Sequence, residues 1–346
     1  MPYQLPPDRR TERRERIGRW IGFGFAALLV ALVAYFGYVG YEGSRQLADA
    51  PNPSRDCRTP ATLGWTYEAI NYDIAADVAV ASQADPTECA TSGPPAGDAL
   101  TGADGVPLAG WYVPAGSGAA PTSATVVLAH GWGGNKSTML DRAAVLHEAY
   151  NLVLFDFRNH GQSGEAPTTQ GVREAGDLRA VLDWLQATKA PEQVALFGVS
   201  MGGASALSVA DDDERVDVLV VESTHATLAN AAQARLDQAG YPLSLPGSWA
   251  ILLGSLLRTG EDVSAADPIA AASRLDGQPV LFIHGDLDDS IGPTDAEDLR
   301  AAAAEAGSPA ELQRCPTAGH GGAPTACPEE YPGWVLGFLE RVLPPG

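Results

Sequence analysis

The sequence predicts an α/β fold, with a mostly parallel central sheet, helices on both faces of that sheet and one N-terminal transmembrane helix. Two observations predict it. Beyond residue 100, short apolar runs without polar alternation recur between helical patterns, which is typical of parallel strands buried on both faces. Near the N-terminus, residues 20–41 carry no charge, and this stretch is long enough to span a membrane.

The composition limits the classes of function. The chain has 346 residues, 45% hydrophobic and 19% charged, so it can form a sizeable core and is neither disordered nor wholly embedded in a membrane. Its 22 Lys and Arg against 43 Asp and Glu give a net charge of −21. Because binding to nucleic acid needs a basic surface that releases counterions, we expect no nucleic-acid partner.

Residues 20–41 would extend about 33 Å as a helix, close to the roughly 30 Å of a bilayer's hydrocarbon core. Arginines are frequent in residues 1–19, just before this stretch: Arg9, Arg10, Arg13, Arg14, Arg16 and Arg19. Because cytoplasmic flanks are enriched in Lys and Arg, we expect residues 1–19 to be cytoplasmic and the chain after Tyr41 to be extracytoplasmic.

A cleaved signal peptide is the alternative to a permanent anchor. Ala48-Asp49-Ala50 has the small-x-small form of a cleavage site. The apolar run, however, exceeds the roughly 7–15 residues usual for signal peptides, and Pro51 would directly follow the cut. We therefore favour an uncleaved, single-pass anchor.

The remaining chain divides into a linker, residues 42–64, and a folded body, residues 65–346. Strands are predicted at 107–114, 124–129, 151–155, 193–197, 216–221, 279–283 and 312–315, and helices at 138–150, 172–189, 293–307 and 331–343. About fifty residues, 224–277, separate two of these strands where one helix would suffice. We expect them to form a short helical cap over the edge of the sheet where ligands bind.

All four cysteines follow the predicted anchor, which agrees with an oxidising compartment. No C-x-x-C pair occurs, which argues against a zinc ribbon or a thioredoxin-type site. Four cysteines allow three pairings. We favour the local ones, Cys57–Cys89 and Cys315–Cys327.

The segment Gly198-Val199-Ser200-Met201-Gly202 follows one predicted strand and opens a helical pattern. G-x-S-x-G in this context places a serine on a strained turn between strand and helix, where the glycines make room for it. The pattern alone is weak. Its strand-turn-helix context makes it a strong indication of a nucleophilic serine.

Three further segments supply the groups that such a serine needs. His130-Gly131-Trp132-Gly133-Gly134 follows the predicted strand at 124–129, His284-Gly285-Asp286-Leu287-Asp288 follows the one at 279–283, and Ala318-Gly319-His320 comes after 312–315. Nucleophile, acid and base thus occur in the order Ser, Asp, His. Each lies just beyond the carboxyl end of a strand, so the fold would gather them at one edge of the sheet.

On the segments GWYVP, HGWGGN, DFRNHGQSG, GVSMGG, IHGDLD and AGHGG, in this order, the sequence resembles the serine α/β-hydrolase superfamily over about residues 100–343. It looks most like the membrane-anchored α/β-hydrolase-domain branch related to prolyl-oligopeptidase-like hydrolases. The resemblance implies the α/β-hydrolase fold, with Ser200 as nucleophile, His320 as base and Asp288 as the acid that orients it. Backbone N–H groups of Trp132 and Met201 would form the oxyanion hole.

Two points concern other side chains near this site. Asp286 and Asp289 share the acid's loop, and the family's spacing after His-Gly favours Asp288 over both. Among the remaining residues, we expect His225, Tyr241 and Trp249 to line the pocket, His130 and His284 to be structural supports, His160 to shape the floor of the site, and His147 to lie on the surface of a helix. No H-E-x-x-H occurs, and a serine triad needs neither metal nor cofactor, so we expect none.

These features predict a membrane-anchored serine hydrolase that cleaves carboxylic esters, including lipid or acyl esters, through an acyl-enzyme. A serine peptidase of prolyl-oligopeptidase-like type is the nearest alternative, although the sequence lacks the repeats of a propeller domain. A thioesterase is less favoured because its usual substrates are cytoplasmic. A non-catalytic binding module on the same scaffold is the alternative of a different class. The oligomeric state is left open.

Overall fold

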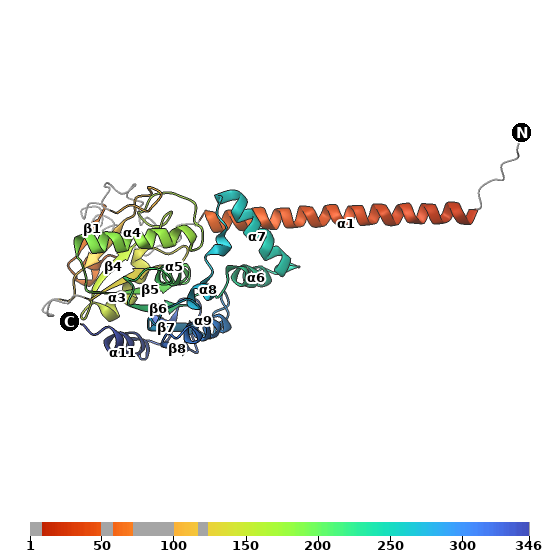
Figure 1. Ribbon diagram of the computed structural model, residues 1–346. Helices are drawn as coiled ribbons and strands as arrows, with labels where there is room; N and C mark the ends of the chain where they lie inside the picture. Colours follow the sequence, from red (N-terminus) through yellow and green to blue (C-terminus); the bar gives the residue numbers. More distant parts are fainter. Residues whose placement is uncertain (1–8, 50–57, 72–99, 117–123, 346) are drawn as a thin grey trace, which may run out of the picture.

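The computed structural model describes residues 9–49, 58–71, 100–116 and 124–345. Within them, the strands form a single sheet in the order β1-β2-β4-β3-β5-β6-β7-β8 (Figure 1). The β1–β2 and β2–β4 pairings are antiparallel, and the pairings from β4 through β8 are parallel. The mostly parallel α/β architecture predicted from the sequence is therefore confirmed.

The strands coincide closely with the apolar runs of the sequence. Their bounds are β1 Glu68–Ile70, β2 Gly110–Val113, β3 Ala124–Ala129, β4 Asn151–Phe155, β5 Gln193–Val199, β6 Val218–Glu222, β7 Val280–Gly285 and β8 Ala310–Cys315. In β3 all six residues are buried, because alternate side chains enter the hydrophobic clusters on opposite faces: Val127 packs on one face, and Val126 and Leu128 pack on the other.

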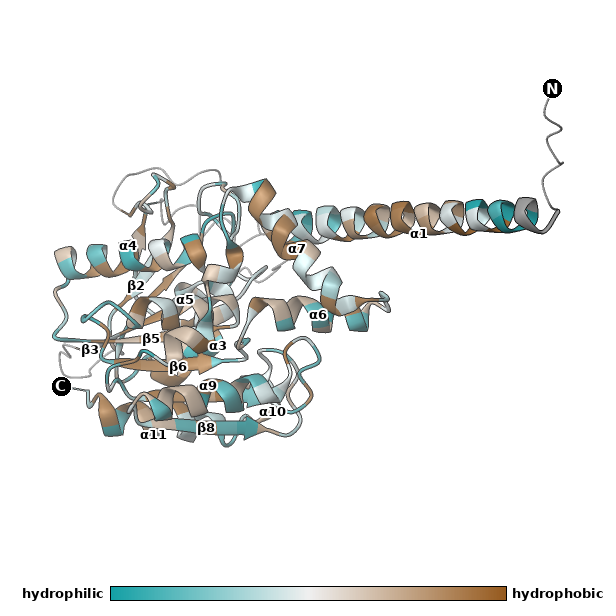
Figure 2. Ribbon diagram, turned by 45° about the vertical axis from the view of Figure 1, so that its right-hand side comes forward, coloured by the Kyte–Doolittle hydropathy of each residue, from teal (hydrophilic) through white to brown (hydrophobic). Residues whose placement is uncertain are grey.

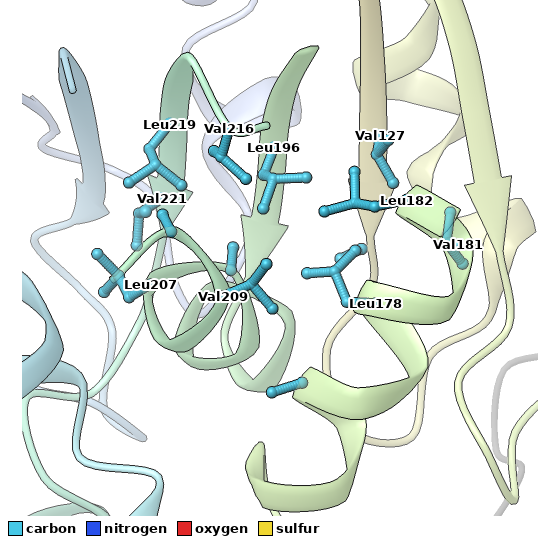
Figure 3. Close-up of a cluster of buried hydrophobic side chains, with 14 of the residues drawn as sticks. Val127, Leu178, Val181, Leu182, Leu196, Leu207, Val209, Val216, Leu219 and Val221 are labelled. Carbon is cyan, nitrogen blue, oxygen red and sulfur yellow. The ribbon is translucent and has the colours of Figure 1, made fainter. Parts of the chain in front are cut away.

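Helices cover both faces of the sheet. On one face lie α4 (Val172–Thr188), α5 (Met201–Ala210), α8 (Pro268–Ala272) and α9 (Pro293–Glu305), and on the other lie α3 (Leu140–Leu146) and α11 (Tyr331–Val342). Figure 3 shows part of the first face, where Leu178 and Leu182 of α4 lie beside Leu196 of β5. These leucines are spaced so that one stripe of α4 enters the core. A short helix, α10 (Ala323–Ala326), precedes α11.

The interval between β6 and β7 contains α6 (Leu228–Gln238), α7 (Ser244–Thr259), a 3-10 turn at Val263–Ala265, and α8. Of these, α6 and α7 stand away from the sheet: α7 packs against the N-terminal helix α1 (Arg9–Ala48), and α6 packs against α7 (Figure 1). We call α6 and α7 the cap. Further 3-10 turns occupy Pro60–Leu63 and Lys136–Met139.

The first helix, α1, runs without interruption over Arg9–Ala48. Its N-terminal part projects away from the body, and its central turns are the most hydrophobic (Figures 1 and 2). The predicted linker at 42–64 is therefore wrong at its start, because the helix continues to Ala48. Tertiary packing explains the extension: Val39, Ser44 and Ala48 are buried against the cap and the body.

Candidate active site

Ser200 occupies the turn between β5 and α5, with φ 54° and ψ −117°. This backbone geometry is strained for a residue with a side chain, and glycines make it possible. A Cβ at Gly198 would lie 2.4 Å from the carbonyl oxygen of Gly202, and one at Gly202 would lie 2.2 Å from that of Ala129. The N–H of Ser200 donates to the carbonyl of Glu222 at 2.8 Å and so ties the turn to the end of β6.

The structure brings Ser200, His320 and Asp288 together at the carboxyl edge of the sheet. Ser200 follows β5, Asp288 lies in the loop after β7, and His320 lies in the loop after β8. His320 Nε2 is 3.0 Å from Ser200 Oγ, and His320 Nδ1 is 2.8 Å from Asp288 Oδ2. A continuous chain of hydrogen bonds thus links carboxylate, imidazole and hydroxyl, with the hydroxyl side exposed and the carboxylate side chain fully buried.

The second oxygen of Asp288 is also fixed. Its Oδ1 accepts hydrogen bonds from the N–H groups of Ser290 at 3.0 Å and Ile291 at 2.9 Å. Burial opposes ionisation of this carboxyl, but the hydrogen bond and charge interaction with His320 and the bond from Ile291 outweigh it, so the pKa of Asp288 lies below its ordinary value. The carboxylate is therefore ionised and correctly placed to hold one imidazole tautomer.

The two neighbouring acids have other partners. Asp286 accepts a hydrogen bond from the Arg314 guanidinium at 2.6 Å, on the surface. Asp289 faces the hydroxyl of Ser290 at 3.5 Å. Of the three acids in this loop, Asp288 is the one that forms a hydrogen bond with His320.

The two predicted oxyanion donors lie beside Ser200. Met201 is the first residue of α5, and Trp132 lies in the loop after β3; both line a cavity that contains Ser200 and His320. Within the described residues, neither backbone N–H donates to another backbone carbonyl. The loop also approaches the serine closely, since a Cβ at Gly131 would lie 3.2 Å from Ser200 Cβ.

Two buried histidines hold the loop that carries Trp132. His130 Nδ1 donates to the carbonyl of Gly131 at 2.8 Å, and its Nε2 accepts from the N–H of Phe157 at 3.1 Å. His160 Nε2 accepts from the N–H of Gly133 at 3.0 Å. Burial lowers the pKa of His130 to about 3, so its imidazole is neutral and can accept. The supporting position expected for His130 agrees with these contacts.

His147 lies elsewhere than the sequence indicated. We expected a surface position, but it is 6% exposed and stacks on Trp65, with ring centroids 4.1 Å apart. The indole comes from the segment before β1, far away in the sequence. His284, at the end of β7, is fully buried; its Nε2 lies 3.0 Å from the carbonyl of Ile291 and 3.5 Å from Asp288 Oδ2.

A buried ionic network, which the sequence did not reveal, supports the His320 loop. The Arg142 guanidinium donates to both oxygens of Glu222, at 2.8 and 2.6 Å, and to the carbonyl of Gly321 at 2.7 Å. Tyr331 Oη donates to the same carboxylate at 2.9 Å. Burial opposes the charge on Arg142, but the Glu222 carboxylate keeps its pKa above the ordinary value. From the sequence, Arg142 would be expected on the surface of its helix. Only the contact with Glu222 of β6 shows that it supports the His320 loop.

Two cavities border Ser200. One, of about 350 Å³, lies towards Arg58 and α3; the other, of about 260 Å³, lies towards the cap. His225 lines the second cavity, and burial and the nearby His320 lower its pKa to about 4. Tyr241 lines a different cavity, between α1 and the cap. Trp249 is 59% exposed on α7 and lines neither cavity beside Ser200, so the expectation that it lines the pocket is not met.

A disulfide joins Cys315, at the end of β8, to Cys327, which follows α10. The bridge encloses the loop that carries His320. The predicted local pairing is confirmed for these two cysteines. Cys57 and Cys89 lie outside the described residues.

Comparison with known proteins supports the same assignment of fold. Residues 124–271 match the family described as alpha/beta hydrolase fold. The uncharacterized protein YfhR of Escherichia coli (strain K12) is 30% identical over 212 residues, which cover 60% of this chain and 67% of that protein.

Among solved structures, the esterase Pf2001 of Pyrococcus furiosus is similar with a TM-score of 0.61 at 22% identity, covering 83% of this chain and 96% of that one. The acylaminoacyl peptidase of Pyrococcus horikoshii is similar with a TM-score of 0.53 at 16% identity, but only 39% of that chain is covered. At these identities the likeness establishes a shared fold.

Proposed function

Because this chain belongs to the α/β-hydrolase family, we propose that it is a serine hydrolase that cleaves carboxylic esters through an acyl-enzyme. The observation that carries the proposal is the unbroken hydrogen-bonded chain from Ser200 Oγ through His320 to Asp288, with bonds of 3.0 and 2.8 Å. Three residues from distant parts of the sequence meet in the arrangement that activates a hydroxyl for attack.

In this mechanism, Ser200 Oγ attacks the ester carbonyl carbon while His320 Nε2 takes the hydroxyl proton. Asp288 stabilises the resulting imidazolium through Nδ1. The negative charge that develops on the carbonyl oxygen is bound by the N–H groups of Trp132 and Met201, and losing one such donor typically costs about 10²–10³ in turnover. When the tetrahedral intermediate collapses, the bond to the alcohol breaks and His320 gives its proton to that alcohol.

Water then resolves the acyl-enzyme. His320 removes a proton from the water as its oxygen attacks the acyl carbon, and the same proton returns to Ser200 as the carboxylic acid leaves. Each proton taken by the imidazole is given back within the cycle. No cofactor is needed for either half-reaction.

An ester is favoured over a peptide as the substrate because the chain matches an esterase over nearly its whole length and a peptidase over less than half of its length. The chain covers 96% of an esterase but 39% of a peptidase. In addition, the interval between β6 and β7 forms a small cap whose buried cluster is apolar, which suits the acyl part of a lipid-like ester. A serine peptidase is the second candidate, because the same groups attack amides.

The proposal includes a membrane anchor in the segment 20–41 of α1. In α1 the apolar window is unburied, and Trp20, Phe23 and Leu28 are 72, 64 and 57% exposed. Cleavage after Ala50 would remove Val39 and Ala48, which are buried at 3 and 2% exposure, and would uncover the cap. A permanent anchor keeps this packing, with the N-terminus in the cytoplasm and the body outside.

The anchor and its orientation can be tested together. The intact mass of protein recovered from the membrane fraction should include residues 1–50, whereas a mass that begins at Pro51 would indicate a cleaved signal peptide. Protease added outside intact cells should degrade the body and leave an N-terminal fragment. A body that is protected until the cells are lysed would contradict the orientation.

The catalytic assignment is tested with a fluorophosphonate probe, which phosphonylates an activated serine with loss of fluoride. Wild-type protein should be labelled and Ser200→Ala should not, while Ser208→Ala, on the same helix α5, is the matched control and should label normally. Chromogenic esters assayed beside peptide arylamides then separate esterase from peptidase. Absence of both labelling and turnover in the wild type would favour a non-catalytic binding module.

A further inference from the structure

Two cavities of similar size meet beside the loop that follows β3. The first, of about 260 Å³, contains Ser200 and His320. The second, of about 280 Å³, lies between α1 and the cap. They have four wall residues in common: Leu47, Trp132, Ala232 and Arg235. The shared residues place the two cavities side by side, and their combined volume falls within the roughly 300–1,000 Å³ typical of ligand pockets.

The far cavity is lined largely by apolar side chains. Val39 of α1, Leu236 of α6 and Ile251 of α7 belong to one buried cluster around it. Glu42 also lines this cavity, and its carboxylate is paired with Arg45 at 2.6 Å. Tyr38 lies at its α1 wall, within the uncharged stretch 20–41. The cavity therefore begins where the apolar part of the anchor ends.

The last turn of α1 is held against the candidate site by hydrogen bonds to its carbonyl groups. The carbonyl of Leu47 accepts hydrogen bonds from Trp132 Nε1 and Gln170 Nε2, both at 3.2 Å, and that of Ala48 accepts from the N–H of Thr168 at 3.0 Å. These bonds satisfy carbonyls that a helix end leaves without partners. One of them holds the indole of Trp132, whose backbone N–H is the proposed oxyanion donor.

With residues 20–41 in the bilayer, as proposed, the α1–α7 contact would place the cap at the level of the membrane surface. A Cβ at Gly40 would lie 2.6 Å from the carbonyl oxygen of Ala250, and one at Gly254 would lie 2.3 Å from that of Gly40, so the two backbones touch. Such close approach through small residues is typical of helices packed in membranes. A second groove, about 630 Å³, runs along the same crossing and is bordered by Phe36 and Leu257.

Large apolar side chains cover the outer side of α7. Trp249, Leu253 and Leu257 are 59, 57 and 79% exposed, and Leu245 is 55% exposed. Exposed Trp and Leu on one helix are typical of helices that lie at the boundary between headgroups and acyl chains. This face adjoins the apolar part of α1, because Leu253 and Leu257 border the same groove as Phe36, and the bilayer is the partner that fits both.

We propose that the two cavities form an acyl-chain channel that opens towards the bilayer at the crossing of α1 and the cap and ends at Ser200, so that the anchor helix supplies one wall of the substrate site. This inference rests on the proposed function and names its substrate class: a membrane lipid ester with one long acyl chain. The ester group lies at Ser200, and the chain extends past Trp132 and Ala232 between α1 and α6.

The direct test uses the full-length wild-type protein in detergent and a long-chain alkyl fluorophosphonate with a diazirine at the end of the chain. After phosphonylation and illumination, peptide mass spectrometry should find the tail crosslinked to residues 38–47 of α1 or to α6. Crosslinks in the cavity on the other side, around Arg58 and Pro324, would overturn the channel. Failure to phosphonylate Ser200 at all would overturn the proposed function and this inference with it.

Enzyme kinetics provide the second test. With nitrophenyl esters from acetate to palmitate, the wild-type kcat/KM for laurate should exceed that for acetate at least tenfold; a maximum at acetate would overturn the channel. Ala232→Phe places a ring at the junction of the cavities and should lower the laurate-to-acetate ratio at least tenfold. Ala234→Phe, on the same helix but lining neither cavity, should leave the ratio within twofold. Equal ratios in the two variants would contradict the inference.

Discussion

Removing the Arg142 guanidinium should both destabilise the protein and disturb the His320 loop. Arg142→Met keeps much of the side chain's length but deletes three hydrogen bonds: two to Glu222, at 2.8 and 2.6 Å, and one to the carbonyl of Gly321, at 2.7 Å. The Glu222 side chain is fully buried. It would retain the hydroxyl of Tyr331 as its hydrogen-bonding side-chain partner.

The expected cost follows from that burial. Breaking a buried ion pair by removing one partner typically costs about 3–5 kcal/mol, because the other charge is left uncompensated. Tyr331→Phe removes one hydrogen bond to a charged group and should cost about 1.5–3 kcal/mol. Arg142→Met combined with Glu222→Leu removes both charges, so it should be less destabilised than Arg142→Met alone.

The assay is urea-induced unfolding in detergent, with the free energy of unfolding obtained by linear extrapolation. Arg274→Met is the matched control, since Arg274 also pairs with a carboxylate, that of Asp211, but its side chain is 56% exposed; it should cost at most about 1 kcal/mol. Arg142→Met should also lower kcat, because the carbonyl of Gly321 is released next to His320. If Arg142→Met loses no more free energy of unfolding than Arg274→Met, the buried ion pair does not have the importance inferred from its burial.

Two further predictions concern the acid and the pH dependence of stability. Asp288→Asn should lower kcat by about 10³–10⁴, because the amide no longer holds the required imidazole tautomer, whereas Asp286→Asn should cost less than tenfold; similar losses in steady-state ester hydrolysis would contradict the assignment. Burial lowers the pKa of His130 to about 3 and that of His225 to about 4, so below about pH 6.5 the unfolded chain binds protons that the folded chain does not. Each of the two histidines then removes about 2 kcal/mol of stability at pH 5. Asp177, whose pKa burial raises to about 6, returns about 1.4 kcal/mol, so the net loss is about 2.5 kcal/mol. Urea titrations at pH 7 and pH 5 measure this, and equal or greater stability at pH 5 would contradict it.

The sheet and the candidate site could be predicted because both depend on short stretches of sequence: apolar runs for the strands, and motifs that directly follow them for the site. Apolar runs without alternation predicted β3 to β7 to within two residues, and for β3 and β4 the predicted and observed ranges coincide. The motif around Ser200 and the loops with Asp288 and His320 each follow such a strand. Since the ends of neighbouring parallel strands meet at one edge, their proximity follows from topology alone.

What the sequence did not predict depends on contacts between distant segments. The end of α1 reads as a linker from Glu42 onwards, yet it stays helical because Ser44 and Ala48 are buried by elements far along the chain. His147 reads as a surface residue until Trp65 covers it. Trp249 has the size of a pocket residue, but the orientation of α7 against α1 turns it outwards, and that orientation is set by backbone packing at Gly40.

The central claim is that Ser200 forms the covalent intermediate, and trapping that intermediate tests it most directly. Full-length protein is mixed with an excess of a nitrophenyl ester, quenched in acid within milliseconds and digested for peptide mass spectrometry. We expect a burst of about one nitrophenol per active site and an acyl group on the peptide that contains Ser200. A burst with an unmodified Ser200 peptide, or an acyl group on another residue, would contradict it.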